Sequence, residues 1–166
     1  VFVIVILGVL AAVAVPRFVT TRTDAQVAMA RSDIASTLKA IPARVFAENL
    51  DPTASAPTGF SNWGEWMIDT GGLDRGRWKV GGGGTINTNQ GNNGIEPLGN
   101  VTSSSGSSTT HTTGGCGQVI WIDTSGNLIF NPDNIPATHS SSNNSGTFCK
   151  ALKASYPSGS NRIIPL

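Results

Sequence analysis

The sequence predicts an α+β protein with the type of architecture in which a long N-terminal helix protrudes from a loop-rich head. Three observations predict this fold. The chain opens with an apolar run, an amphipathic helical pattern follows directly, and beyond Leu50 the composition turns to Gly, Ser, Thr and Asn with short β-type runs. We expect an apolar helix at residues 1–22, its amphipathic half packed on a small antiparallel sheet at 23–50, and a β-rich head with one disulfide at 51–166.

The opening run, residues 1–15, contains no charged side chain and no side chain that forms hydrogen bonds. As a helix it would be roughly 22 Å long, whereas a bilayer crossing needs about 20 apolar residues. A signal-peptide core has this length, but the amphipathic pattern that follows argues against one. The run alone is therefore too short to cross a membrane, and we expect further residues upstream to complete a span.

Past Pro16, apolar residues recur three and four positions apart, which is typical of a helix packed along one side. We expect a single helix that is bent or interrupted at Pro16, where the backbone N–H is missing and the ring clashes with the preceding turn. Pro42 is a second candidate for a bend or for the start of fraying. Asp51 and Pro52 should end the helix. The apolar stripe consists of Val27, Ala30, Ile34, Leu38, Ile41 and Val45.

The string VIVILGVLAAVAVPRF, residues 3–18, resembles the N-terminal helix of type IV pilins and type II secretion pseudopilins. The resemblance rests on the spacing of Gly8, the pair Ala11 and Ala12, Pro16 and Phe18, and it does not extend to the head. It implies that a short stretch of the mature chain, with a methylated aromatic residue and a glutamate, precedes Val1. The self-assembly glutamate of that family therefore has no counterpart in this sequence.

The resemblance implies the type IV pilin fold and a structural role as a major pilin. Such a chain is first anchored in the inner membrane and then polymerises with copies of itself into a cell-surface filament. By resemblance its partners are a prepilin peptidase, an ATP-driven assembly platform and a secretin. Two alternatives remain open, a pseudopilin that forms a short periplasmic pseudopilus and a membrane-anchored monomeric binding module.

A helix that is apolar on all sides must be covered by lipid or by neighbouring subunits. Glycine and proline weaken a helix interior by about 1 and 3 kcal/mol relative to alanine. We therefore expect helix to give way to extended chain between Gly8 and Pro16, as the resemblance implies for filaments, with close helix packing at Gly8 as the alternative. The expected packing residues are Val1, Phe2, Ile4, Ile6, Leu7, Val9, Leu10 and Val13.

The most ordered part of the head should be residues 118–130, QVIWIDTSGNLIF. Its two β-type runs, VIWI and LIF, are separated by the turn-forming string DTSGN, which predicts a β-hairpin. Residues 63–68 and 77–80 are further candidate strands of the same sheet. The inner face of this sheet would cover the apolar stripe of the helix.

Cys116 and Cys149 are an even pair in a domain with few core residues, which predicts a disulfide in an exported protein. Closing that loop adds about 3–4 kcal/mol in the chain-entropy model. A metal or redox role is disfavoured, because there is no CxxC pair and the two histidines, His111 and His139, lie in polar low-complexity surroundings. By resemblance, pilins carry such a disulfide and secretion pseudopilins usually lack it, so the cysteines favour a pilus.

Two low-complexity stretches, residues 81–93 and 102–113, have almost no apolar side chains and should be exposed loops. Clustered hydroxyls make the second stretch a candidate for O-linked sugars, with a bare flexible loop as the alternative. The candidate residues are Ser103, Ser104, Ser105, Ser107, Ser108, Thr109 and Thr110.

Other sites are weakly indicated. Asp123, Asn127 and Asp133 could supply oxygen ligands to calcium, but turn formation by DTSGN explains them better. With a formal net charge of +1, the chain offers no strong field for nucleic acid, and the basic residues of segment 75–79 form only a small cluster. No catalytic or phosphate-binding motif occurs in the sequence, so we expect neither an enzyme nor a cofactor.

Overall fold

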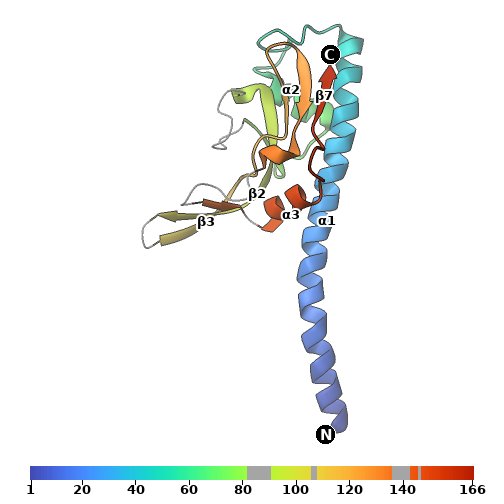
Figure 1. Ribbon diagram of the computed structural model, residues 1–166, viewed down its shortest axis with the longest axis vertical. Helices are drawn as coiled ribbons and strands as arrows, with labels where there is room; N and C mark the ends of the chain where they lie inside the picture. The colour runs from blue at the N-terminus through green and yellow to red at the C-terminus, as the bar shows by residue number, and fades with distance from the viewer. Residues whose placement is uncertain (82–90, 106–107, 136–142, 146) are drawn as a thin grey trace.

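The fold is α+β, with one long helix lying along a head of two short helices and an antiparallel sheet (Figure 1). The computed structural model describes residues 1–81, 91–105, 108–135, 143–145 and 147–166, and within them leaves out the side chains of 11–21, 100–114 and 143–145. Helix α1 (Phe2–Glu48) packs against the head with its second half, whereas its first half extends well beyond the head (Figure 1).

Helix α1 is continuous through Gly8, Pro16 and Pro42 and curves gently over its N-terminal half (Figure 1). Of the two outcomes expected at Pro16, the interruption is absent from the single chain, whereas the extended segment that the resemblance implies for filaments between Gly8 and Pro16 stays a prediction. Proline removes one hydrogen bond from the ladder, and the helix responds by bending instead of ending (Figure 1). The helix ends at Glu48, before the predicted stop, because Asn49 takes the left-handed conformation.

Residues 63–68, which we expected to be a strand, belong to helix α2 (Trp63–Gly71). The side-chain oxygen of Asn62 accepts a 2.8 Å hydrogen bond from the Glu65 N–H and so caps the first turn. Gly72 ends the helix in the left-handed conformation. The strand prediction is wrong, because the buried apolar residues of this run recur with helical spacing; they are Trp63, Trp66, Met67 and Ile68.

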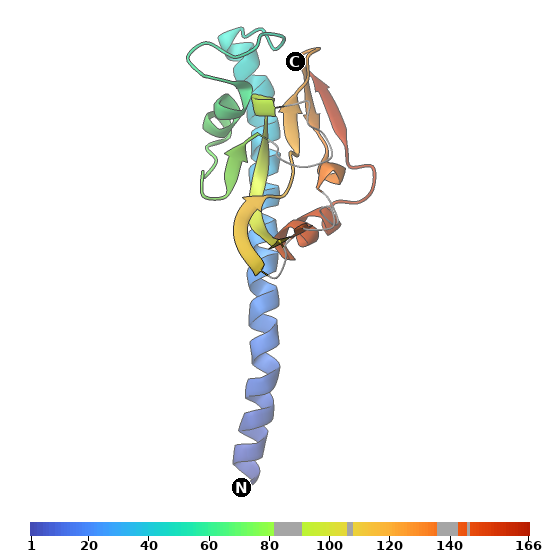
Figure 2. The same cartoon turned by 90° about the vertical axis from the view of Figure 1, so that its left-hand side faces the viewer.

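The sheet is antiparallel throughout, and its main path runs in the order β1 (Trp78–Val80), β2 (Gly94–Ser105), β4 (Ile120–Ile122), β5 (Asn127–Phe130) and β7 (Arg162–Pro165). The predicted hairpin is confirmed, since β4 pairs with β5 and Trp121 lies opposite Ile129. The strand predicted at residues 77–80 is β1. Figure 2 looks onto the head from the side opposite α1 and shows how the strands cover the upper half of the helix.

The second half of β2 leaves the main sheet and forms a ribbon with β3 (Ser108–Gly115), in register from Leu98↔Gly115 to Ser105↔Ser108. Strand β6 (Asn143–Ser145) pairs with the other edge of β2. The loop predicted at residues 102–113 is thus largely strand, because threonine favours β-structure even where few apolar residues are present. Ser107 lies outside the described residues, as do residues 82–90 of the other low-complexity stretch.

One core cluster joins the helices to the sheet. The predicted stripe of α1 faces this core: Ile34 and Ile41 are fully buried, and Leu38 is partly buried. Helix α1 contacts α2 and α3 (Thr147–Ala154), and its stripe shares one core cluster with residues of the sheet, so the head covers it with more elements than we predicted. The predicted disulfide is present between Cys116, just after β3, and Cys149 in α3.

Candidate assembly surface

The most unusual surface of the molecule is the N-terminal part of α1, residues 1–10, which we call the apolar rod. Every side chain of the rod is exposed, from 52 % at Ile6 to 102 % at Val1. A side chain added at Gly8 would meet no atom within 4 Å. The predicted packing residues that lie in the rod are therefore all uncovered in the single chain; they are Val1, Phe2, Ile4, Ile6, Leu7, Val9 and Leu10. The remaining predicted packing residue, Val13, lies outside the described side chains.

An apolar surface of this kind is costly in water. Soluble monomers rarely expose a continuous apolar patch of more than a few hundred Å², and covering such a surface yields about 25 cal/mol per Å². Because the rod is apolar on all sides, one flat partner surface cannot cover it. Its chemistry fits lipid or a bundle of similar helices.

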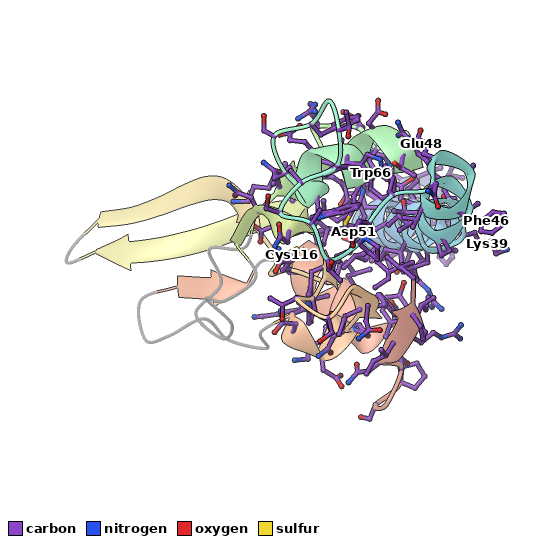
Figure 3. The ribbon with its side chains drawn as sticks, turned by 90° about the horizontal axis from the view of Figure 1, so that it is seen from above. Lys39, Phe46, Glu48, Asp51, Trp66 and Cys116 are labelled. Atoms are coloured by element: carbon purple, nitrogen blue, oxygen red, sulfur yellow. A yellow bond between two sulfur atoms is a disulfide. The ribbon has the colours of Figure 1, made fainter. Side chains whose placement is uncertain are left out.

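The outer side of α1 continues this character beyond the rod. The side of the helix that faces away from the head carries mostly small side chains, where a solvent-facing helix would normally carry charges. Phe46 is 89 % exposed there, and Figure 3 shows Phe46 and Lys39 pointing away from the head. We did not predict this surface, although the helical period would have shown it. Its small exposed residues are Ala25, Ala28, Ser32, Ala35, Ser36, Ala43 and Ala47.

Arg44 fixes the upper end of α1 to helix α2. Its guanidinium contacts Asp69 at 2.7 Å and the Thr70 hydroxyl at 2.9 Å, and it also pairs with Glu48 on its own helix at 2.8 Å. The hydrogen bonds to Glu48 and Asp69 raise the pKa of Arg44 above its ordinary value. The same group lies over the ring of Trp66 at 5.4 Å.

Asp33 fixes the middle of α1 to the first strand of the sheet. Its Oδ2 accepts a 3.1 Å hydrogen bond from Nε1 of the buried Trp78, and it lies 3.5 Å from Arg77 Nη2. With Arg44, this contact holds the packed half of α1 in a fixed direction. Since α1 is continuous, the apolar rod is held in the same direction, away from the head (Figure 1).

Two of the weak calcium candidates, Asp123 and Asn127, are hydrogen-bonded to each other. Asp123 Oδ1 accepts the backbone N–H groups of Ser125 and Asn127 at 2.9 and 2.8 Å, and its Oδ2 accepts the Asn127 side-chain N–H at 3.2 Å. These are the bonds of a hairpin turn. Asp133 is exposed in a short 3-10 helix, and among the described residues no group of three His, Cys, Asp or Glu side chains could hold a metal ion.

The small basic cluster is neutralised by acidic partners. Arg75 pairs with Glu65, and Arg77 pairs with Asp33 and, at 3.8 Å, with Asp74. Lys79 Nζ lies 3.0 Å from Oε1 of Glu96, a buried carboxylate on β2. The cluster therefore presents little free positive charge for a phosphate backbone.

The O-glycosylation candidates lie on the ribbon, apart from Ser107, which is outside the described residues. Ser103, Ser104 and Ser105 belong to β2, whereas Ser108, Thr109 and Thr110 belong to β3. The ribbon projects from the head on the side away from α1 (Figure 3).

Within the described part of the chain, no helix combines the length and the apolar character needed to cross a membrane. No family model, no curated protein and no solved structure matches this chain.

Proposed function

We propose that this chain is a structural subunit, a major pilin, that polymerises through α1 into a type IV pilus on the cell surface. The observation that carries this proposal is the apolar rod, which is exposed on all sides and held away from a folded head. The outer side of α1 supports it, because its mostly small side chains and the exposed Phe46 extend the surface that packed helices would share.

The proposed mechanism is mechanical. Before assembly, lipid of the inner membrane covers the rod; during assembly, an ATP-driven platform made of other proteins transfers each subunit into the fibre. The rods then pack together in the fibre core, where burial of apolar surface stabilises the polymer. The heads form the outer wall, and the Ser/Thr ribbon, with any O-linked sugars, faces the medium.

A pseudopilin of type II secretion is the second candidate. It would share the rod and the packed stripe, so these features do not separate the two. The disulfide between Cys116 and Cys149 favours the pilus. A calcium-dependent melting temperature would favour the pseudopilin, whereas we expect none, because the Asp123 carboxylate is already occupied by turn hydrogen bonds.

The test is to place a charge in the rod. We expect Leu7→Lys and Leu10→Lys to abolish fibres in cells, because a lysine buried among apolar helices is strongly unfavourable. Ile163→Lys is the matched control, since Ile163 is an exposed apolar residue of the head, and it should leave the fibre yield unchanged. An intact disulfide in all variants would show that the head still folds. A normal yield of fibres from Leu7→Lys and Leu10→Lys would refute the proposed function.

A further inference from the structure

Strand β3 is an edge strand that lacks the usual protection against pairing with another chain. It pairs with β2 on one side, and none of the described residues pairs with its other side. Natural proteins guard such edges with charged residues or prolines. The sequence of β3, STTHTTGG, contains neither lysine, arginine, acidic residue nor proline. By contrast, the edge strand β7 carries Arg162 and Pro165.

The backbone register shows which groups of β3 are open. Cys116 N–H donates a 2.8 Å hydrogen bond to the Pro97 carbonyl, directly beyond the ribbon pair Leu98↔Gly115. Hydrogen-bonded and non-hydrogen-bonded pairs alternate along an antiparallel ladder. Every second residue of β3 therefore directs its N–H and C=O away from β2; within residues 109–113 these are Thr109, His111 and Thr113, and Gly115 follows them.

The open edge is complementary to itself. Residues 109–113 read Thr-Thr-His-Thr-Thr, which is the same in both directions around His111. If two copies meet antiparallel about a two-fold axis at His111, each threonine lies opposite a threonine and the three open residues of each copy exchange hydrogen bonds. Cross-strand threonine pairs are favourable in sheets, and neither strand carries an acidic, lysine or arginine side chain that would repel its copy.

The direction of the ribbon makes this pairing accessible between fibres. Seen from above, the ribbon points away from α1 (Figure 3). In the proposed fibre, with α1 at the core, it would point outward, so ribbons from two adjacent fibres meet from opposite directions and are antiparallel. We infer that the open edge of β3 joins neighbouring fibres by pairing with β3 of a second copy. This inference rests on the proposed function, because it requires fibres.

Size and charge define how such a contact behaves. A pairing of five residues falls far below the roughly 1,000 Å² that a stable interface buries, so separate chains should not dimerise through it. Along two fibres the same contact repeats, and multivalency makes the junction strong.

The contact between two copies should be sensitive to acid, because it places the two His111 residues opposite each other. Within the head, His111 lies opposite Thr102 of β2, and Thr102 lies opposite Asn144 of β6; neither the threonine nor the asparagine side chain titrates. Acid that protonates both histidines of a pair would therefore place like charges opposite each other.

Cysteine cross-linking of purified fibres tests the register. His111→Cys places two thiols at directly opposite positions, where the Cα separation of about 5.5 Å suits a disulfide. Thr110→Cys is the matched control. In this pairing residue 110 lies opposite residue 112 of the copy, so the Cα atoms of the two residues at position 110 are farther apart than the roughly 7 Å that a disulfide can bridge. With mild oxidant we expect covalent dimers from His111→Cys fibres and few from Thr110→Cys fibres. Equal cross-linking of both variants would overturn the inference.

Bundling of fibres, seen by electron microscopy, tests the open backbone groups. Thr109→Pro with Thr113→Pro removes two open N–H groups and no ribbon hydrogen bond, so fibres should form in normal yield but stay single. Thr109→Ala with Thr113→Ala keeps the N–H groups and should bundle like the natural chain. Natural bundles should separate at pH 5 and those of His111→Thr should persist. Bundling by the proline variant would contradict this inference alone, whereas absence of fibres from the natural chain would contradict the proposed function.

Discussion

Arg31 of α1 lies against Tyr156, near the C-terminus, with its guanidinium carbon 4.7 Å from the centre of the tyrosine ring. Arg31 Nη1 also donates a 3.0 Å hydrogen bond to the Ser155 carbonyl. The Tyr156 ring also packs edge-on against Phe130 of β5, with the ring centres 5.4 Å apart. The segment after α3 is thereby held between the long helix and the sheet.

This position makes Tyr156 a reporter of folding. Burial raises the pKa of Tyr156 above its ordinary value near 10, although the nearby Arg31 charge opposes the shift. The folded chain keeps the phenol proton at pH values where the unfolded chain has lost it, so stability is full below pH 10 and falls as the pH rises through the folded pKa. Because this is the only tyrosine, tyrosinate absorbance measures the titration directly.

We expect a higher titration midpoint in the folded chain than in urea. Tyr156→Phe is the control, and its free energy of unfolding should fall less steeply with pH above 10 than that of the natural chain. The same midpoint in both states would show that the phenol is not shielded from water.

The hydrogen bond from Trp78 to Asp33 gives a second prediction. Asp33→Ala leaves the buried indole N–H without its acceptor, which costs about 1–3 kcal/mol of unfolding free energy. Asp24→Ala is the matched control, because Asp24 is an exposed carboxylate on the same helix and should change stability by less than about 0.5 kcal/mol. Urea unfolding in detergent, followed by tryptophan fluorescence, measures both. A similar loss for the two variants would contradict a specific role for this bond.

The parts of the fold that depend on local periodicity could be predicted from the sequence. The apolar residues from Val27 to Val45 recur three and four positions apart, which fits a helix and not a strand. The string VIWI-DTSGN-LIF fits a hairpin, because two short β-type runs are separated by strong turn residues. Helix α2 was missed because a run with two tryptophans at 63 and 66 suits either a strand or a helix. The cap formed by Asn62 and Glu65 was the signal that distinguishes them.

The candidate site was only partly predictable. The apolar rod follows from composition alone, since no polar side chain interrupts it. The ribbon was not predicted, because its strands are specified by pairing between residues 98–105 and 108–115 and not by an apolar pattern. Polar strands of this kind are decided by tertiary context, in which a long β2 begins in the main sheet and carries the pairing outward.

The disulfide supplies a third prediction. Cys116 and Cys149 are fully buried and separated by 33 residues. Replacing both by alanine should lower the unfolding free energy by about 3–4 kcal/mol, because the unfolded chain regains the freedom of the closed loop. Reductant should lower the urea midpoint of the natural chain and leave that of the double variant unchanged. An equal response of the two proteins to reductant would show that the crosslink does not stabilise the head.

The two sides of α1 supply the last prediction. Ile41 is fully buried in the core, so Ile41→Ala removes apolar contacts and leaves a cavity, at a cost of about 2–5 kcal/mol. Phe46, on the outer side of the same helix, is 89 % exposed, so Phe46→Ala should change the unfolding free energy of the single chain by less than about 0.5 kcal/mol.

In the proposed fibre Phe46 should matter, because the outer side of α1 becomes a contact between copies. Phe46→Ala should then lower the temperature at which fibres dissociate while the melting of the separate chain stays the same. A loss of stability in the separate chain would instead place Phe46 within the fold of the single subunit.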